Sequence, residues 1–176
     1  MNATDPSAGT PAPIPPQRTH PGAWLWLSVA VVALDQATKF LVTRFLELYE
    51  RVEVLPVLNF TQLHNTGAAF SLLAGADGWQ RWFFIGLAVT VSTALIVWLW
   101  RLPRGGKLLP VALALILGGA IGNLIDRALH GYVIDFIHVH WGDAFFPAFN
   151  IADSAITIGA ALLILDALRD RGVAKS

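Results

Sequence analysis

Two aspartates stand beside long apolar segments in the C-terminal part of the sequence. Asp135 lies in the segment 133–136 (Val-Ile-Asp-Phe), which follows one apolar segment, and Asp153 lies in the segment 149–154 (Phe-Asn-Ile-Ala-Asp-Ser), which opens the next. If the chain leaves a membrane after the first segment and re-enters with the second, the two carboxylates lie at the same depth. Neighbouring carboxylates do not both ionise easily, so one activates water while the other donates a proton to a scissile carbonyl. The pair predicts acid–base hydrolysis at a membrane surface.

The composition places these aspartates in a membrane protein. Of 176 residues, 55% are apolar and only 14% are charged, against roughly 25% charged residues in soluble domains, and mean hydropathy is +0.58. Trp82 to Trp100 contains no charged residue and would measure about 28 Å as a helix, which matches the hydrocarbon core of a bilayer. The formal net charge of zero gives no basic field for nucleic acid, and the lack of cysteine excludes disulfides and thiolate chemistry.

Four apolar segments predict an all-α membrane protein with four transmembrane helices, at about residues 24–45, 82–100, 108–125 and 149–168. Lysine and arginine gather in the turn 101–107 and near the C-terminus, so the positive-inside rule predicts that both termini are cytoplasmic. The segments 46–78 and 128–148 then face outward, into the periplasm of a Gram-negative cell. Asp135 and Asp153 both fall at this outer edge.

The segments outside the spans differ in composition. Residues 1–22 are rich in proline and small polar residues, which predicts a disordered cytoplasmic tail rather than a cleavable signal peptide. Residues 46–78 contain short alternating apolar stretches, which predict a small β-structured segment between the first and second helices. Residues 137–148 are aromatic-rich and predict a loop along the membrane interface. We therefore expect a membrane domain over 23–170 and a short cytoplasmic tail over 171–176.

Further polar residues are expected at the same depth as the two aspartates: Asp35, Lys39, Asn65, Asn123, Asp126, Arg127 and Asn150. Each also fits a structural role. Asp35 and Lys39 are four apart on one helical face and would form a self-satisfying ion pair. The Asn-Thr-Gly at 65–67 is a turn signal, and Asp153 at the start of a helix would interact favourably with its N-terminus. Position alone does not decide whether Asp126 or Asp135 forms the carboxylate pair with Asp153.

Other chemistries fit less well. The sequence has no His-Glu-x-x-His motif, and His138 and His140 lack a clear third metal ligand. Ser71 or Ser154 with Lys39 would give a serine–lysine pair, which spacing does not exclude. Outside the hydrolases the main alternative is a small transporter or proton-coupled channel, because charges within spans often mark ion paths. Many transporters are built from internal repeats, so four spans with no evident repeat make a transporter less favoured than a hydrolase.

Five motifs occur in order over about residues 22–170 and together resemble the bacterial lipoprotein signal peptidase (signal peptidase II) family. They are the segments 34–39 (Leu-Asp-Gln-Ala-Thr-Lys), 65–71 (Asn-Thr-Gly-Ala-Ala-Phe-Ser), 118–127 (Gly-Gly-Ala-Ile-Gly-Asn-Leu-Ile-Asp-Arg), 133–136 and 149–154. The proline-rich tail lies outside the resemblance.

The resemblance implies an aspartyl endopeptidase with no cofactor or metal. It maps the catalytic pair to Asp135 and Asp153 and gives Asp126 a supporting role. Positions that line the substrate or antibiotic pocket or support it are Asn65, Gly67, Asn123, Arg127 and Asn150, and supporting structural positions are Asp35 and Lys39.

The resemblance also implies a substrate and a location. The substrate is a prolipoprotein whose lipobox cysteine carries diacylglycerol, and cleavage on the N-terminal side of that cysteine releases the signal peptide. The expected partners are these precursors, the phospholipid bilayer and inhibitors of the globomycin type, with no nucleic acid. The protein is expected to be a monomer in the bacterial inner membrane, with its site at the periplasmic side.

Overall fold

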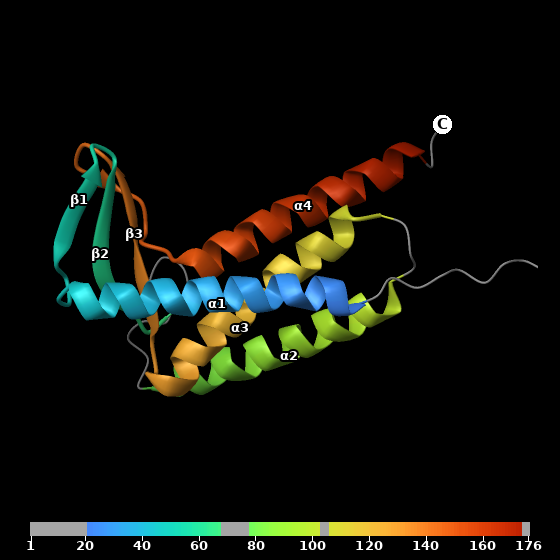
Figure 1. The fold of residues 1–176 in the computed structure, drawn as a ribbon, viewed down its shortest axis with the longest axis horizontal. Helices are drawn as coiled ribbons and strands as arrows, with labels where there is room; N and C mark the ends of the chain where they lie inside the picture. The colour runs from blue at the N-terminus through green and yellow to red at the C-terminus, as the bar shows by residue number, and fades with distance from the viewer. Residues whose placement is uncertain (1–20, 68–77, 103–105, 174–176) are drawn as a thin grey trace, which may run out of the picture.

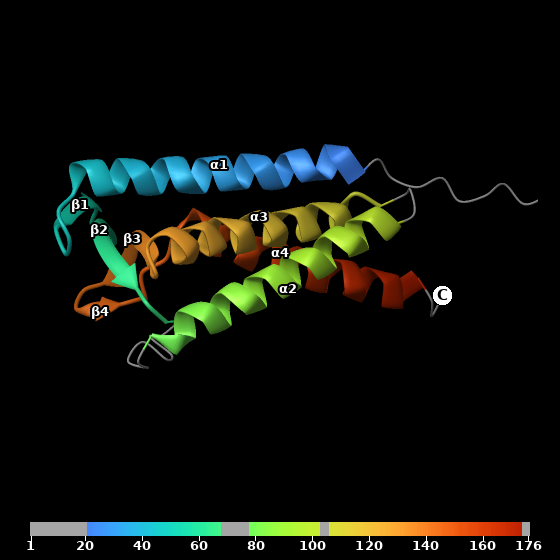
Figure 2. The same ribbon diagram turned by 90° about the horizontal axis from the view of Figure 1, so that it is seen from below.

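The computed structural model describes residues 21–67, 78–102 and 106–173, which form a bundle of four helices with a small sheet at one end (Figures 1 and 2). The helices are α1 (Pro21–Phe45), α2 (Trp79–Arg101), α3 (Leu108–Leu129) and α4 (Ile151–Val173). All four are long and apolar enough to cross a membrane. The prediction of four transmembrane helices is therefore confirmed, while residues 1–20 of the expected tail lie outside the described part of the chain.

The bundle is organised around α3. Half of the apolar window of α3 is buried, against 28% or less for the other three helices. The outward faces of those helices expose large apolar side chains, for example Phe40, Trp82 and Ile164. Water would not tolerate this much apolar surface, whereas lipid covers it at no cost.

Glycines allow the helices to pack closely. A Cβ on Gly118 would lie 2.7 Å from the Cβ of Val31 on α1, and one on Gly159 would lie 2.7 Å from the carbonyl oxygen of Ala112. On Gly119 it would lie 2.7 Å from Cγ1 of Ile156 and would also collide with the backbone of α4. These glycines thus set the distance of α3 from its neighbours α1 and α4.

The sheet joins two segments that are distant in the sequence. Its strands are β1 (Arg51–Leu55), β2 (Leu58–Asn65), β3 (Val133–Trp141) and β4 (Ala144–Phe145), in the order β1-β2-β3-β4, with each neighbouring pair antiparallel. The sheet lies beside the C-terminal end of α1 and the N-terminal end of α4 (Figure 1). The β-structure predicted between the first two helices is confirmed.

The expected interfacial loop at 137–148 is wrong in part, because β3 continues to Trp141 and β4 follows it. Residues 137–141 alternate apolar and polar side chains, the period of a strand. Residues 137–139 pair with β2 from Leu58 to Phe60, and residues 140–141 pair with β4. Asp135 therefore lies inside a strand. A register shift between Phe60 and Leu63 sets Leu63 opposite Asp135 and Asn65 opposite Val133.

We predict that Gly119→Ala separates α3 from the start of α4 and lowers the unfolding temperature in detergent. Overpacking of this kind costs roughly 1–3 kcal/mol, which corresponds to several degrees in a chain of this size. Gly86→Ala is the matched control, because Gly86 lies within α2 and a Cβ there would meet nothing within 4 Å. Equal unfolding temperatures for the two variants, measured by thermal shift, would contradict this account of the packing.

Candidate active site

The structure brings Asp135 and Asp153 to the two sides of one buried residue, Asn150. The side-chain amide of Asn150 donates to Oδ1 of Asp135 at 2.8 Å. Its side-chain oxygen accepts from the backbone N–H of Asp153 at 2.8 Å, and its own backbone N–H donates to Oδ2 of Asp153 at 3.3 Å. A carboxylate on a strand and a carboxylate on a helix are therefore tied together through one amide side chain.

The bonds between Asn150 and Asp153 are those of a capping box. Asn150 precedes the first residue of α4 and Asp153 is its third residue, so each satisfies a backbone N–H that the start of the helix leaves unpaired. The helix-end role considered for Asp153 from the sequence is thus present. It coexists with the position of Asp153 beside Asp135, because the capping bond uses only Oδ2.

Asp135 is almost completely buried on β3. The amide of Asn65, at the end of β2, donates to its Oδ2 at 3.0 Å. Burial first, and then the charge of Asp153, raise the pKa of Asp135 to about 7, against the hydrogen bonds from Asn65 and Asn150 and the charge of Lys39. A carboxyl group with such a pKa is about half protonated in neutral water, so it can donate a proton.

Asn123 on α3 supports Asp153 from the other side. Its amide nitrogen donates to Oδ1 of Asp153 at 2.7 Å. Its oxygen accepts from Nζ of Lys39 at 3.1 Å and from the amide of Asn150 at 3.2 Å. Asn123 thus connects the two aspartates to a charge buried deeper in the bundle.

That charge is the ammonium of Lys39 on α1, which lies 2.8 Å from a carboxylate oxygen of Asp35 and 2.8 Å from one of Asp126. All three side chains are at most 2% exposed. Asp35 also accepts from the backbone N–H of Ala152 at 2.9 Å, and Asp126 accepts from that of Ile134 at 3.0 Å. The ion pair expected from the sequence exists, and it extends to Asp126 and fixes the two segments that carry Asp135 and Asp153.

Gln36 is a residue that the sequence did not single out. Its amide donates to Asp35 at 3.1 Å, to Asp126 at 2.9 Å and to the carbonyl of Gly122 at 3.2 Å. The available signal was its place between Asp35 and Lys39, but adjacent residues on a helix point in different directions, so nothing predicted that Gln36 joins the same network.

Arg127 and Gly67 meet at the edge of the site. The guanidinium of Arg127 donates to the carbonyl of Gly67 at 2.8 Å and lies 4.8 Å from the ring centre of Phe84. The backbone N–H of Gly67 donates to the side chain of Asn65 at 3.0 Å, which forms the turn that the sequence indicated. The rest of that motif, including Ser71, lies outside the described residues.

The other chemistries considered from the sequence find little support. Ser154 donates to the carbonyl of Asn150 at 2.9 Å, and Lys39, held between two carboxylates, is not a free base. Within the described ranges no group of three side chains is placed to hold a metal ion. The ring of His64 stacks on that of Tyr132, with ring centres 3.8 Å apart.

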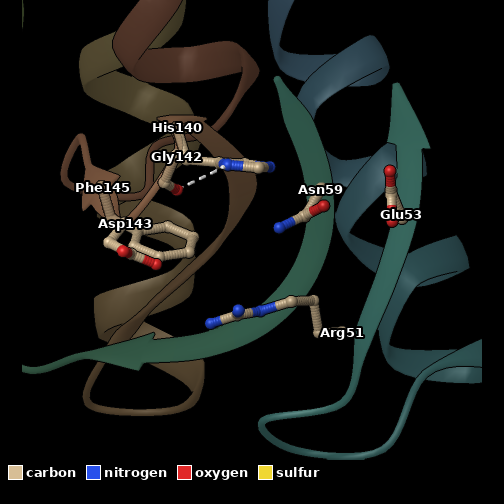
Figure 3. Close-up of a pocket in the computed structure, with 7 residues that line it drawn as sticks. All are labelled: Arg51, Glu53, Asn59, His140, Gly142, Asp143 and Phe145. Carbon is tan, nitrogen blue, oxygen red and sulfur yellow. Dashed lines mark hydrogen bonds between the residues drawn. The ribbon is translucent and has the colours of Figure 1, made fainter. Parts of the chain in front are cut away.

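A separate cavity of about 410 Å³ lies on the sheet (Figure 3). Seven residues line it: Arg51, Glu53, Asn59, His140, Gly142, Asp143 and Phe145. The ring of Phe145 packs against His138 and His140 and lies 4.6 Å from the guanidinium carbon of Arg51. The histidines are thus engaged in packing, and the cavity includes neither Asp135 nor Asp153.

Comparison with known proteins identifies the family of this chain. A family model described as signal peptidase (SPase) II matches residues 27–169. The chain belongs to this family. It is 54% identical to a lipoprotein signal peptidase of Alteromonas mediterranea over 147 residues, which cover 84% of this chain and 81% of the relative. A lipoprotein signal peptidase of Pseudomonas putida is 55% identical over 151 residues, covering 85% of this chain and 88% of the relative.

Two solved structures have a fold similar to that of this chain. A bacterial membrane enzyme determined by the in meso method at 2.3 Å resolution superposes with a TM-score of 0.79 and 35% identity, covering 89% of this chain and 93% of that one. A second, at 1.9 Å resolution, gives 0.76 and 34%, covering 89% and 99%. The resemblance to the signal peptidase II family is confirmed, and membership of a peptidase family favours the hydrolase over the transporter.

We predict that Asp135→Asn makes the protein more resistant to heat above neutral pH. The pKa of Asp135 rises from 3.8 to about 7 on folding, so the folded state binds more protons between these values and stability falls as pH rises through them. The variant removes this penalty, and its unfolding temperature should exceed that of the parent at about pH 8 and approach it at about pH 4. Asp143→Asn, which replaces an exposed aspartate, is the control; an advantage of Asp135→Asn independent of pH would contradict the assignment.

Proposed function

We propose that this protein removes the signal peptide from prolipoproteins whose lipobox cysteine carries diacylglycerol, cutting the peptide bond on the N-terminal side of that cysteine. Its membership of the signal peptidase II family supports a lipoprotein signal peptidase activity. The observation that carries the mechanism is the pair Asp135 and Asp153, tied together through Asn150 at the end of a bundle of membrane-length helices.

Asp135 and Asp153, together called the dyad, catalyse the hydrolysis by proton transfer. One carboxylate removes a proton from water, and the oxygen of that water attacks the carbonyl carbon of the scissile bond. The protonated partner donates its proton to the carbonyl oxygen, which avoids an isolated negative charge in a buried site. When the intermediate collapses, one of its hydroxyl groups returns a proton to the carboxylate that donated one, the C–N bond breaks, and the departing amine takes the proton that the other carboxylate removed from water. Water is consumed, and the dyad returns to its starting state.

The position of the dyad fits a lipid-anchored substrate. Asp153 is the third residue of α4 and Asp135 lies on the adjoining sheet, so both sit where the apolar helices end. Acyl chains that remain in the bilayer contribute about 0.8 kcal/mol of binding for each buried methylene. They would hold the bond next to the modified cysteine at the level of the two carboxylates.

The same geometry supports a membrane orientation. In Figure 1 the sheet and the start of α4 lie at one end of the bundle, and the described start of α1 and end of α4 lie at the other. The end of α2, with Arg101 in its last turn, and the start of α3, preceded by Lys107, also lie at this other end. We infer that both termini are cytoplasmic and that the dyad acts at the periplasmic face of the inner membrane.

Asp135→Asn and Asp153→Asn should each lower the cleavage of a diacylglyceryl-modified prolipoprotein by at least about 10³-fold, because each removes half of the proton-transfer pair. The measurement is the shortening of the precursor on a gel, with purified protein in detergent and with globomycin as inhibitor of the parent. Asp143→Asn, which lies outside the dyad network, should retain normal turnover. Near-normal cleavage by either variant would contradict the assignment of Asp135 and Asp153 as the catalytic pair.

The parent enzyme should lose activity as pH rises through about 7, because the dyad needs one proton and burial raises the pKa of Asp135 to about 7. The quantity to measure is kcat/KM for precursor cleavage against pH, which reports ionisation of the free enzyme. A profile that stays flat to about pH 9 would be incompatible with a protonated Asp135 in the mechanism.

A further inference from the structure

A hydrogen-bonded chain connects the buried ammonium of Lys39 to one member of the dyad. Nζ of Lys39 donates to Oδ1 of Asn123 at 3.1 Å, and Nδ2 of Asn123 donates to Oδ1 of Asp153 at 2.7 Å. No equivalent chain reaches Asp135 among the described residues. Its two amide donors are Asn65 and Asn150, whose side-chain oxygens accept from the backbone N–H groups of Gly67 and Asp153 and not from a charged side chain.

We propose that Lys39 is a positioning residue that acts through Asn123 to hold Asp153 as the ionised member of the dyad, so that Asp135 carries the proton at rest. The inference rests on the function proposed above and deepens it, because it gives each aspartate a separate task. Asp153 takes the proton from water, and Asp135 gives its proton to the carbonyl oxygen.

Lys39 dictates the orientation of the Asn123 amide. The oxygen of Asn123 faces two donors, the ammonium of Lys39 and the amide of Asn150. Turning the amide over would point its NH₂ group at both of them and would leave one N–H of the buried ammonium, the one not bonded to Asp35 or Asp126, without an acceptor, which is costly. The NH₂ group must therefore face Asp153, where it donates to a carboxylate oxygen.

The chain also transmits charge. Hydrogen bonds with a charged end polarise the groups between them, and they are stronger in a buried site than in water. The bond from Asn123 to Asp153 is the shortest amide–carboxylate bond around the dyad, at 2.7 Å. Asp153 also lies in the first turn of α4, where the helix dipole favours a negative charge.

The other charged groups around the dyad are consistent with this assignment. On α1 and α3, Asp35 and Asp126 flank Lys39 and oppose its effect in part. Arg127 on α3 attracts the charges of both dyad members, Asp153 more strongly than Asp135. On β3, the pKa of Asp135 is raised to about 7 by burial and then by the charge of Asp153, which agrees with a proton on Asp135.

The test compares two variants that remove opposite charges from the same cluster. Lys39→Gln removes the positive charge, and Asp126→Asn removes a negative charge without changing the shape of the side chain. The measured quantity is kcat/KM for cleavage of the lipid-modified precursor across the acid limb of the pH profile, where the ionised member of the dyad becomes protonated.

We expect the two variants to move the acid limb in opposite directions. Lys39→Gln should move it to higher pH by about one unit, which lowers kcat/KM about tenfold on the acid side, with KM nearly unchanged at neutral pH. Asp126→Asn should move it to lower pH. A purely structural role for Lys39 lowers activity evenly and leaves the limb in place, so an unmoved limb or equal shifts in both variants overturns the proposal.

The relay through Asn123 has its own control. In the Asn123→Leu background, Lys39→Gln should move the acid limb by a smaller amount, because the connecting amide is absent and only the through-space attraction between Lys39 and Asp153 remains. A shift of the same size in both backgrounds overturns the role of Asn123. Thermal unfolding in detergent checks that each variant is folded. If Lys39→Gln does not fold, the pH profile of Asp126→Asn still tests the proposal, because only a shift of its acid limb to lower pH agrees with it.

Failure of this inference is distinguishable from failure of the proposed function. If the parent protein does not cleave the lipid-modified precursor, the function is wrong. If the parent cleaves the precursor and Asp135→Asn and Asp153→Asn do not, the function holds. If Lys39→Gln then leaves the acid limb at the same pH, the inference alone fails.

Discussion

The arrangement of the whole site depends on one buried ammonium. Lys39 is taken out of water within a membrane-length helix, which is expensive unless its charge is matched. Asp35 and Asp126 match it, and their remaining capacity is used on the backbone N–H groups of Ala152 and Ile134. Removing one partner of such a cluster costs roughly 3–5 kcal/mol. The same contacts that neutralise the charge therefore fix α4 and β3 against α1 and α3.

In the proposed mechanism, Asp153 serves the fold and the reaction together. Its Oδ2 takes part in the capping box that starts α4, while Oδ1 accepts from Asn123. A loop residue would need other contacts to hold it in place, whereas the first turn of a helix is already rigid. Stability and chemistry are not in competition at this position, because the start of the helix needs a carboxylate acceptor and the reaction needs a carboxylate in a fixed orientation.

Much of the fold was predictable, and the exceptions have physical reasons. The four spans follow from hydropathy, which depends on local composition alone. The strand β3 was missed, since the aromatic residues of 137–148 favoured an interfacial loop; its pairing with β2 joins residues that are distant in the sequence. For the site, depth gathered polar residues that the structure also brings together, but it left Asp126 and Asp135 equivalent. Their difference lies in their partners: Asp126 is paired with the ammonium of Lys39, whereas the neutral amides of Asn65 and Asn150 donate to Asp135.

The bond between Asp35 and the backbone of Ala152 joins residues 117 positions apart in the chain. Chains are synthesised from the N-terminus, and segments associate as they emerge. The first helix and the hairpin of β1 and β2 thus exist well before α4, but the carboxylate of Asp153 and the capping box that orients it come with the last helix to be made. A partly synthesised chain holds only one of the two aspartates in place, so proteolytic competence arrives together with the complete bundle and not before it.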